Sequence, residues 1–209
     1  MTTVEPVQEF TQLATAEQIS ATVHALEANH MRTIVVETGE EARTAVLEMI
    51  PSGVEVFHTA SRTLERIGLA NAIATSPRFQ PVRPQMAALD RATQQREIRT
   101  LAARPDVIVG SVQAITEQGQ VLIASATGSQ LGPAASGAGS VIWVVGTQKL
   151  VRTLDQGYRR IQEFCYPLEN ERTRRVYGQA SAINKLLIVQ GEAVPDRIRI
   201  VLVKQLLGF

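Results

Sequence analysis

The sequence VIVGSVQAITEQGQVLIASATGSQLGPAASGAGSVIWVVGTQKLV, which spans residues 107–151, decides the fold of this chain. It contains two strongly apolar, β-branched runs, Val121–Ala124 and Val141–Val145. Each run is short and flanked by glycine, which is typical of strands that are buried on both faces of a sheet. The middle of the chain therefore predicts the interior of a β-sheet, and Trp143 is expected in its core.

Between the two runs lies a loop, residues 125–139, with almost no large side chains. Its small residues cannot build a core, yet the loop is longer than a plain connection needs. A backbone of this composition allows close approach of a ligand or a neighbouring chain, and it offers N–H and hydroxyl donors to anions. We therefore expect a functional loop, with Gly128, Ser129 and Gln130 as ligand-binding candidates.

On either side of this stretch, strand signals and helix signals alternate. Capping residues at Thr15, Thr38 and Ser61 each precede a run with helical periodicity. The runs with strand character are Met31–Val36, Val54–His58, Lys185–Val189 and Arg197–Val203. This alternation predicts an α/β fold with a mostly parallel sheet.

The segment from Thr75 to Arg104 differs from the rest because three prolines interrupt it before a run, Met86–Ala103, that predicts one helix. One face of that helix is rich in charge. Such a face is typical of a solvated surface, and contact with a partner is the alternative interpretation.

The composition limits the organisation and the partners. A chain of 209 residues that is 44% hydrophobic can bury one substantial core, so we expect a loose arm over residues 1–14 and a single domain over residues 15–209. The formal net charge of +1 creates no overall field that would attract nucleic acid or an anionic membrane. Neither a signal peptide nor a transmembrane span is visible, so the cytoplasm is the expected location.

The chain has one cysteine, Cys165. It cannot form an intrachain disulfide, and by itself it cannot hold zinc or an iron–sulfur cluster. Cys165 shares a helical stripe with Leu154 and Ile161, so we expect a small buried hydrophobic residue and not a nucleophile.

Several short motifs occur in a fixed order: GSVQAITEQG (Gly110–Gly119), Gly128–Gln130, Val141–Lys149, Arg160-Ile161, Pro167–Glu169, Glu171-Arg172, Asn184-Lys185 and Leu207–Phe209. This pattern resembles that of the LUD-domain family, which includes lactate-utilisation protein C. The resemblance covers roughly residues 30 to 209.

The resemblance implies a Rossmann-like, mostly parallel sheet with helices on both faces. This fold is similar to that of ribose-5-phosphate isomerase, glucosamine-6-phosphate deaminase and the CoA transferases. Some family members belong to a lactate-oxidising system with iron–sulfur oxidoreductase subunits. Because this chain lacks the cysteines for a cluster, the resemblance implies that partner subunits would bring the clusters and that this chain alone holds no cofactor.

Glu117 is the candidate catalytic residue. In the CoA transferases, a glutamate beside a glycine at a strand end is the nucleophile, and Glu117 resembles it through its place before Gly119. The alternative is an ordinary polar residue in a hairpin turn. The fold analogy supports a site more than it supports a particular reaction.

Two further groups complete the candidate site. Gln148 and Lys149 closely follow the strand Val141–Val145, so they are expected at the carboxyl edge of the sheet, where ligands of open α/β folds bind. An ammonium there favours a carboxylate or phosphate, and a surface ion pair is the alternative. Residues Ser61, Arg62 and Thr63 resemble the hydroxyl-rich turns that hold phosphate, although Ser61 is also simply a good helix cap.

The histidines support no metal site: His24 and His30 are expected as packing residues of the first helix, and no second histidine or cysteine lies close to His58 in sequence. If residues 107–109, 121–124 and 141–145 are neighbouring strands of one sheet, Glu117 and Lys149 share a pocket for a small anion. Two functions fit these observations. One is a ligand-handling component of lactate or organic-acid utilisation; the other is a non-catalytic assembly or regulatory subunit that docks oxidoreductase partners, with a homodimer as the default state.

Overall fold

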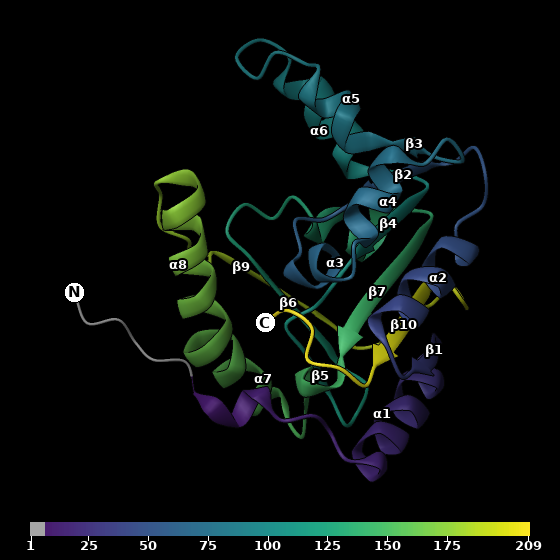
Figure 1. Cartoon of the computed structure of the whole chain (residues 1–209), viewed down its shortest axis with the longest axis vertical. Coiled ribbons are helices and arrows are strands. Elements are labelled where there is room, and N and C mark those ends of the chain that lie inside the picture. The colour runs from purple at the N-terminus through teal and green to yellow at the C-terminus, as the bar shows by residue number, and fades with distance from the viewer. Residues whose placement is uncertain (1–6) are drawn as a thin grey trace.

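A six-stranded parallel sheet forms the centre of the computed structural model, which describes residues 7–209 (Figure 1). The strand order is β1-β10-β7-β4-β2-β3. The bounds are β1 Met31–Val36, β2 Glu55–His58, β3 Gln80–Pro81, β4 Val107–Gly110, β7 Ser140–Gly146 and β10 Ile198–Val203. All five pairings between neighbouring strands are parallel. The predicted α/β fold with a parallel sheet is therefore confirmed.

Strand β7 shows why this sheet is buried on both faces. Alternate side chains of a strand point to opposite faces, and every side chain from Val141 to Val145 is buried. Val141, Trp143 and Val145 pack in a core with Ile19 and Leu26 of helix α1. Ile142 and Val144 pack in a second core, to which α2, α3 and α4 contribute. Both faces of the sheet are thus covered by helices, as expected.

The helices begin at the capping residues that the sequence indicates. Thr15 forms a full capping box with Gln18, Thr38 accepts a hydrogen bond from the Glu41 N–H, and Ser61 accepts one from the Leu64 N–H. The bounds are α1 Ala16–Ala28, α2 Gly39–Met49, α3 Arg62–Arg66 and α4 Leu69–Thr75.

A second, four-stranded sheet covers the α1 side of the parallel sheet, with the order β8-β5-β6-β9. Its strands are β5 Ala114–Thr116, β6 Val121–Ser125, β8 Leu150–Val151 and β9 Lys185–Val189. The expectation that residues 107–109, 121–124 and 141–145 are neighbours in one sheet is therefore wrong for residues 121–124. The chain folds back after β4, and β6 pairs antiparallel with β5 and β9 in the outer layer.

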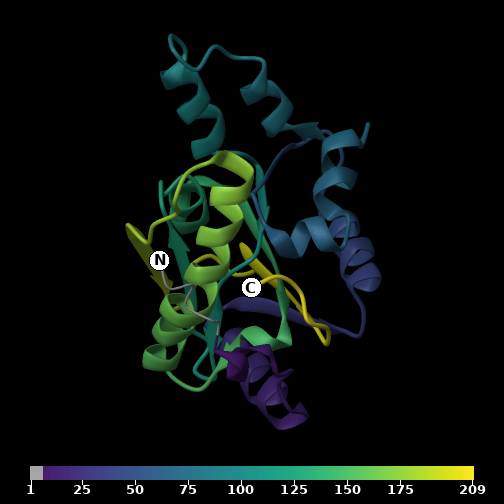
Figure 2. The same ribbon diagram turned by 60° about the vertical axis from the view of Figure 1, so that its left-hand side comes forward.

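Helix α7 packs on the outer side of the second sheet, against β5 and β8, and α8 continues the chain from it through η4 (Figures 1 and 2). Helix α7 spans Leu154–Arg160, the π-helical turn η4 spans Ile161–Cys165 and α8 spans Tyr166–Tyr177. Gly157 allows the close contact, because a Cβ at this position would lie 3.0 Å from Leu122 of β6. Cys165 is buried, as its place on the helical stripe predicts.

The segment that predicts one helix over Met86–Ala103 instead forms two, α5 Val82–Ala87 and α6 Gln95–Ala103. Asp90 separates them: its carboxylate accepts hydrogen bonds from the Ala92 N–H at 2.8 Å and from the Thr93 hydroxyl at 2.7 Å. Such local bonds compete with helical ones. The two helices form an arm that projects from the rest of the protein (Figures 1 and 2).

Part of the expected N-terminal arm is packed. The 3-10 turn η1, Gln8–Thr11, places the Phe10 ring against Phe164, with 6.0 Å between the ring centroids. Phe10 is buried, so it extends the core beneath η4. Residues 1–6 of the expected arm lie outside the part of the chain that the structure describes.

The glycine-rich loop ends in a π-helical turn, η2 Pro133–Gly137, that packs on α6. At Gly137 a Cβ would collide with the Ala103 carbonyl oxygen, so only glycine fits there. Gly137 is therefore required by the close approach of two backbones and needs no ligand to explain it.

We expect Gly137→Ala to destabilise the fold by about 2 kcal/mol or more, because the collision is with backbone that cannot move aside. Gly132→Ala is the matched control. Gly132 has helical dihedrals and no atom within 4 Å of an added Cβ, so the substitution should be neutral or stabilise by up to about 1 kcal/mol. Urea unfolding of both variants measures the difference. Equal stabilities would contradict the close packing of η2 on α6.

Candidate functional site

A pocket lies at the carboxyl edge of the parallel sheet, where the direction of the chain path reverses. After β2 the chain continues to β3 on one side, whereas after β4 it continues to β7 on the other side. Ligands of open α/β sheets bind at such a switch point. The pocket there has a volume of about 270 Å³.

The pocket has one wall from each layer of the protein. Residues 59–63 after β2 and residues 111–113 after β4 form the wall on the side of the parallel sheet. The opposite wall consists of the end of β6 with part of the glycine-rich loop, the start of α8, and residues 181–183. Figure 2 shows α8 and the second sheet on one side of this edge and α3 on the other.

Lys149 lies at the floor of this pocket. It ends the 3-10 turn η3, Thr147–Lys149, directly after β7, and only 1% of its surface is exposed. Its Nζ lies 3.1 Å from the Thr63 hydroxyl and 3.1 Å from the Ser111 hydroxyl. The segments that follow three neighbouring strands, β2, β4 and β7, therefore bring the two hydroxyls and the amine within hydrogen-bond distance.

The two hydroxyls differ in what they can do. Thr63 donates its proton to the Leu207 carbonyl at 3.1 Å, so its oxygen can only accept from Lys149. The Ser111 hydroxyl has Lys149 as its hydrogen-bond partner within residues 7–209 and is free to rotate. It can accept from an ammonium or donate to a neutral amine. The floor of the pocket therefore accommodates both protonation states of Lys149.

Burial lowers the pKa of Lys149 from 10.5 to about 7. Removal from water is the largest cause, the positive charge of Arg160 lowers the pKa further, and Cys165 opposes the shift. No carboxylate within residues 7–209 lies within ion-pair distance of the amine. Lys149 is thus a buried cation without a counter-ion in the described chain.

Arg160 is a second fully buried cation, with 0% of its surface exposed. It donates to the Gln113 carbonyl and to the Cys165 sulfur, and its guanidinium lies 5.1 Å from the centre of the Phe164 ring. Its Nε and second terminal nitrogen have no hydrogen-bond partner within residues 7–209. Burial lowers the pKa of Arg160, but arginine stays protonated in proteins. Burial also raises the pKa of the Cys165 thiol, so that group is neutral.

Three arginines stand around the pocket. Arg62 pairs with Glu65 at 2.6 Å, and Arg172 pairs with Glu169 through two bonds of 2.7 Å. Arg83 donates to the His58 carbonyl at 2.6 Å and forms no ion pair within residues 7–209. Together with Lys149, four cations line the pocket against two carboxylates, so its field is positive.

Most of the ligand-binding residues expected from the sequence come together here. Ser61, Arg62, Thr63, Ser129, Gln130 and Lys149 all line the pocket. Gly128 and Gln148 do not line it. Gln148 is buried and donates to the Leu207 carbonyl at 3.1 Å, which holds the C-terminal tail. Gly128, with φ +85°, turns the loop over the Lys185 side chain.

Glu117 does not join these residues, so the expected pocket shared by Glu117 and Lys149 does not form. Glu117 lies in the turn of the β5–β6 hairpin, which Gly119 closes with φ +76°. Its carboxylate accepts a hydrogen bond from Gln18 of α1 at 3.3 Å. The geometry therefore matches the alternative interpretation, a polar residue in a hairpin turn. The strand that precedes it belongs to the second sheet, which the sequence does not reveal.

No group of three or more potential metal ligands occurs within residues 7–209. In the same part of the chain, no helix has the length and apolarity needed to cross a membrane. His58 directly precedes Thr59, which lines the pocket, and burial lowers the pKa of His58, with the charge of Arg83 acting in the same direction.

The sequence alone did not point to Ser111, Arg83, Arg160 or Cys165 as parts of the site. Ser111, Arg160 and Arg172 lie inside the motifs GSVQ, Arg160-Ile161 and Glu171-Arg172, so those motifs were the available signal. Arg83 lies in the proline-interrupted segment, where no motif marks it. Its position depends on how α5 packs beside β2.

We expect the stability of the protein to rise with pH above about 7, because the unfolded chain holds the Lys149 proton up to about 10.5 and the folded chain releases it near 7. The slope contributed by Lys149 is up to about 1.4 kcal/mol per pH unit, and Lys149→Met should lack it. Lys204→Met, which removes an exposed lysine, should keep the wild-type slope because its Lys149 is intact. Urea unfolding between about pH 7 and about pH 9 measures the slopes. Parallel curves for wild type and Lys149→Met would exclude the pKa shift.

Comparison with known proteins agrees with this architecture. A DUF162 family protein from Deinococcus radiodurans, known from a crystal structure, has a similar fold, with a TM-score of 0.57 and 15% identity over 92% of this chain and 99% of that chain. A structure of eIF2B beta from Chaetomium thermophilum gives a TM-score of 0.34 and 16% identity over 67% of this chain and 44% of the other, which is too weak to support an argument. Among curated proteins, no sequence matches significantly. The LUD domain matches residues 19–203, most of the chain. The resemblance seen in the motifs is confirmed: the chain belongs to the LUD-domain family, which is associated with lactate utilisation.

Proposed function

We propose that this protein binds a small organic acid of the lactate type in the pocket above Lys149, as a ligand-handling component of organic-acid utilisation. The observation that carries the proposal is the amine of Lys149, which is fully buried, lines the pocket and has no carboxylate partner within residues 7–209, while the buried Arg160 adds positive charge behind it. A buried charge without a partner is costly, and a bound anion would offset that cost. The family's association with lactate utilisation supports this class of anion.

The size and lining of the pocket support a small polar ligand. A volume of about 270 Å³ lies just below the usual range for pockets that hold drug-sized ligands, so it suits a smaller molecule. Ser111, Ser129 and Gln130 add hydroxyl and amide groups that can bond to the hydroxyl and carboxylate of a hydroxy acid. The arginines at the pocket raise the local concentration of anions.

We expect L-lactate to bind the wild-type protein and Lys149→Met to weaken that binding roughly 10- to 100-fold, the usual cost of losing a hydrogen bond to a charged group. Lys204→Met is the matched control, since Lys204 pairs with Glu37 outside the pocket. Isothermal titration calorimetry measures both affinities. Equal affinities for the wild type and Lys149→Met would place the ligand elsewhere, and no binding of L-lactate or related hydroxy acids would reject the proposal.

Binding should also depend on pH. Because Lys149 has a pKa of about 7, part of it is neutral at pH 7, and an anion would bind best to the ammonium form. The affinity for L-lactate should therefore fall as the pH rises through about 7, and binding at pH 7 should take up protons from the buffer. Titrations in buffers of different ionisation enthalpy measure the uptake. An affinity that does not change from about pH 6 to about pH 8 would show that Lys149 does not hold the anion.

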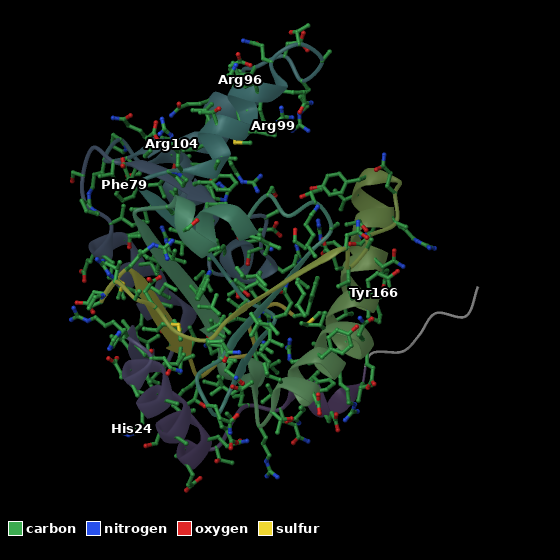
Figure 3. All side chains as sticks on the ribbon, turned by 180° about the vertical axis from the view of Figure 1, so that it is seen from behind. His24, Phe79, Arg96, Arg99, Arg104 and Tyr166 are labelled. Atoms are coloured by element: carbon green, nitrogen blue, oxygen red, sulfur yellow. The ribbon has the colours of Figure 1, made fainter. Side chains whose placement is uncertain are left out.

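A second candidate function, docking of an oxidoreductase partner, is favoured by the α5–α6 arm. Arg96, Arg99 and Arg104 are exposed on or beside α6 and form no ion pair within residues 7–209 (Figure 3). A projecting cationic surface suits an acidic partner. Exchange of Arg96 and Arg99 for glutamate should abolish co-purification of iron–sulfur oxidoreductase subunits from the native host and leave L-lactate binding unchanged. Co-purification that survives this exchange would exclude the arm as the docking surface.

A further inference from the structure

We propose that the Lys149 amine forms a covalent imine with the carbonyl carbon of a small 2-oxo acid in this pocket. The inference rests on the proposed anion site and goes beyond it, because it names a second substrate class and a covalent step. A 2-oxo acid carries the same carboxylate as a 2-hydroxy acid, with an electrophilic carbonyl in place of the hydroxyl-bearing carbon. One pocket can therefore bind both, but only the 2-oxo acid can react.

The position of the amine is the first argument. The chain has three lysines, Lys149, Lys185 and Lys204, and Lys149 alone is buried. It lines the pocket, and its Nζ is held by two hydroxyls, that of Thr63 in α3 and that of Ser111 directly after β4. A fixed amine beside a bound carbonyl replaces a chance encounter by an intramolecular reaction, which can be worth several orders of magnitude in rate.

The charge state of the amine is the second argument. The groups that act on Lys149 from the elements around it are Arg160 of α7 and Cys165 of η4, together with the hydroxyls of Thr63 and Ser111. With a pKa of about 7, Lys149 has a large neutral fraction at neutral pH. Only the neutral amine is a nucleophile, and desolvation next to another cation is a known way to obtain it in a lysine.

The step balances without an oxidant or a reductant. The Lys149 lone pair attacks the carbonyl carbon, a C–N bond forms, and the carbonyl electron pair moves to oxygen. The nitrogen then loses a proton and the oxygen gains one, which gives a carbinolamine. The hydroxyl takes up a second proton and leaves as water, and the nitrogen lone pair forms the C=N bond of a protonated imine. The Ser111 hydroxyl, at 3.1 Å from Nζ, is placed to pass protons to and from the nitrogen.

The pocket is also suited to the product. A protonated imine keeps the positive charge of the original ammonium, so the carboxylate of the adduct keeps a cationic neighbour. Arg83, which has no ion pair within residues 7–209, lines the same pocket and offers a second charge for that carboxylate. Reversible imine formation would retain a 2-oxo acid and activate the carbon next to its carbonyl, because the imine draws electrons from that carbon.

The test is reductive trapping with pyruvate as the probe. The wild-type protein is incubated with pyruvate and sodium cyanoborohydride, digested, and analysed by peptide mass spectrometry. We expect a carboxyethyl group on Lys149, formed at least about tenfold faster than on Lys185 or Lys204, which are internal controls in the same sample. L-Lactate, which has no carbonyl, should slow the labelling of Lys149 but not that of the exposed lysines.

Two variants and a pH comparison sharpen the test. Lys149→Arg keeps the positive charge but cannot form an imine, so labelling at this position should be lost, with thermal unfolding as the check on its fold. Lys204→Met should label Lys149 like the wild type. With pyruvate at saturating concentration, labelling of Lys149 should be faster at about pH 8 than at about pH 6, opposite to the pH dependence expected for L-lactate affinity, because imine formation uses the neutral amine.

The outcomes separate this inference from the proposed function. If L-lactate binds and Lys149 is not labelled, or is labelled no faster than the two exposed lysines, the imine is overturned and the anion site stands. Selective labelling of Lys149 without measurable L-lactate binding supports the imine and rejects the hydroxy acid as ligand. If L-lactate does not bind and Lys149 is not selectively labelled, both the anion site and the imine are rejected.

Discussion

The burial of Lys149 beneath the ends of β2, β4 and β7 is the constraint on which the rest of the site depends. Its amine holds the hydroxyls of Thr63 and Ser111, and Thr63 in turn donates to the carbonyl of Leu207. Gln148, the residue before the lysine, donates to the same carbonyl. One short segment therefore joins three strand ends and the C-terminal tail. Because the Lys149 side chain is fixed at this junction, its amine cannot reach solvent, and its charge must be offset by a bound anion or lost by release of a proton.

The layered fold brings the second buried cation to the same place. Arg160 comes from α7, on the far side of the second sheet, and Phe10 and Phe164 lie on its guanidinium. The parallel sheet thus supplies the lysine and the outer layer supplies the arginine. Burial lowers the pKa of both groups, and the charge of Arg160 lowers that of Lys149 further. Neither group forms an ion pair with a carboxylate within residues 7–209. The two layers meet around a pocket with a positive field. This field attracts an anionic ligand, and in the absence of a ligand it favours the neutral form of the Lys149 amine.

The glycine-rich loop divides into two parts with different physical tasks. Residues 125–130 turn at Gly128 and bring Ser129 and Gln130 to the pocket. The turn η2, Pro133–Gly137, instead packs on α6, where Gly137 permits contact between two backbones. A run of small residues has the same appearance in a sequence whether it approaches a ligand or another backbone. Only the contacts in the folded chain distinguish the two.

The sequence by itself determined the parallel sheet, the caps of the first three helices, the family, and six of the residues that line the pocket, because these features depend on local periodicity and on the order of strands along the chain. The tertiary structure decided the rest. It placed β6 in a second sheet, and so took Glu117 away from Lys149, because strand pairing is set by contacts between residues far apart in the chain. It also decided the charge of Lys149. A lysine near a strand end has an ordinary pKa unless the folded chain excludes water from it, and here only 1% of the Lys149 surface is exposed and Arg160 of α7 lowers its pKa further.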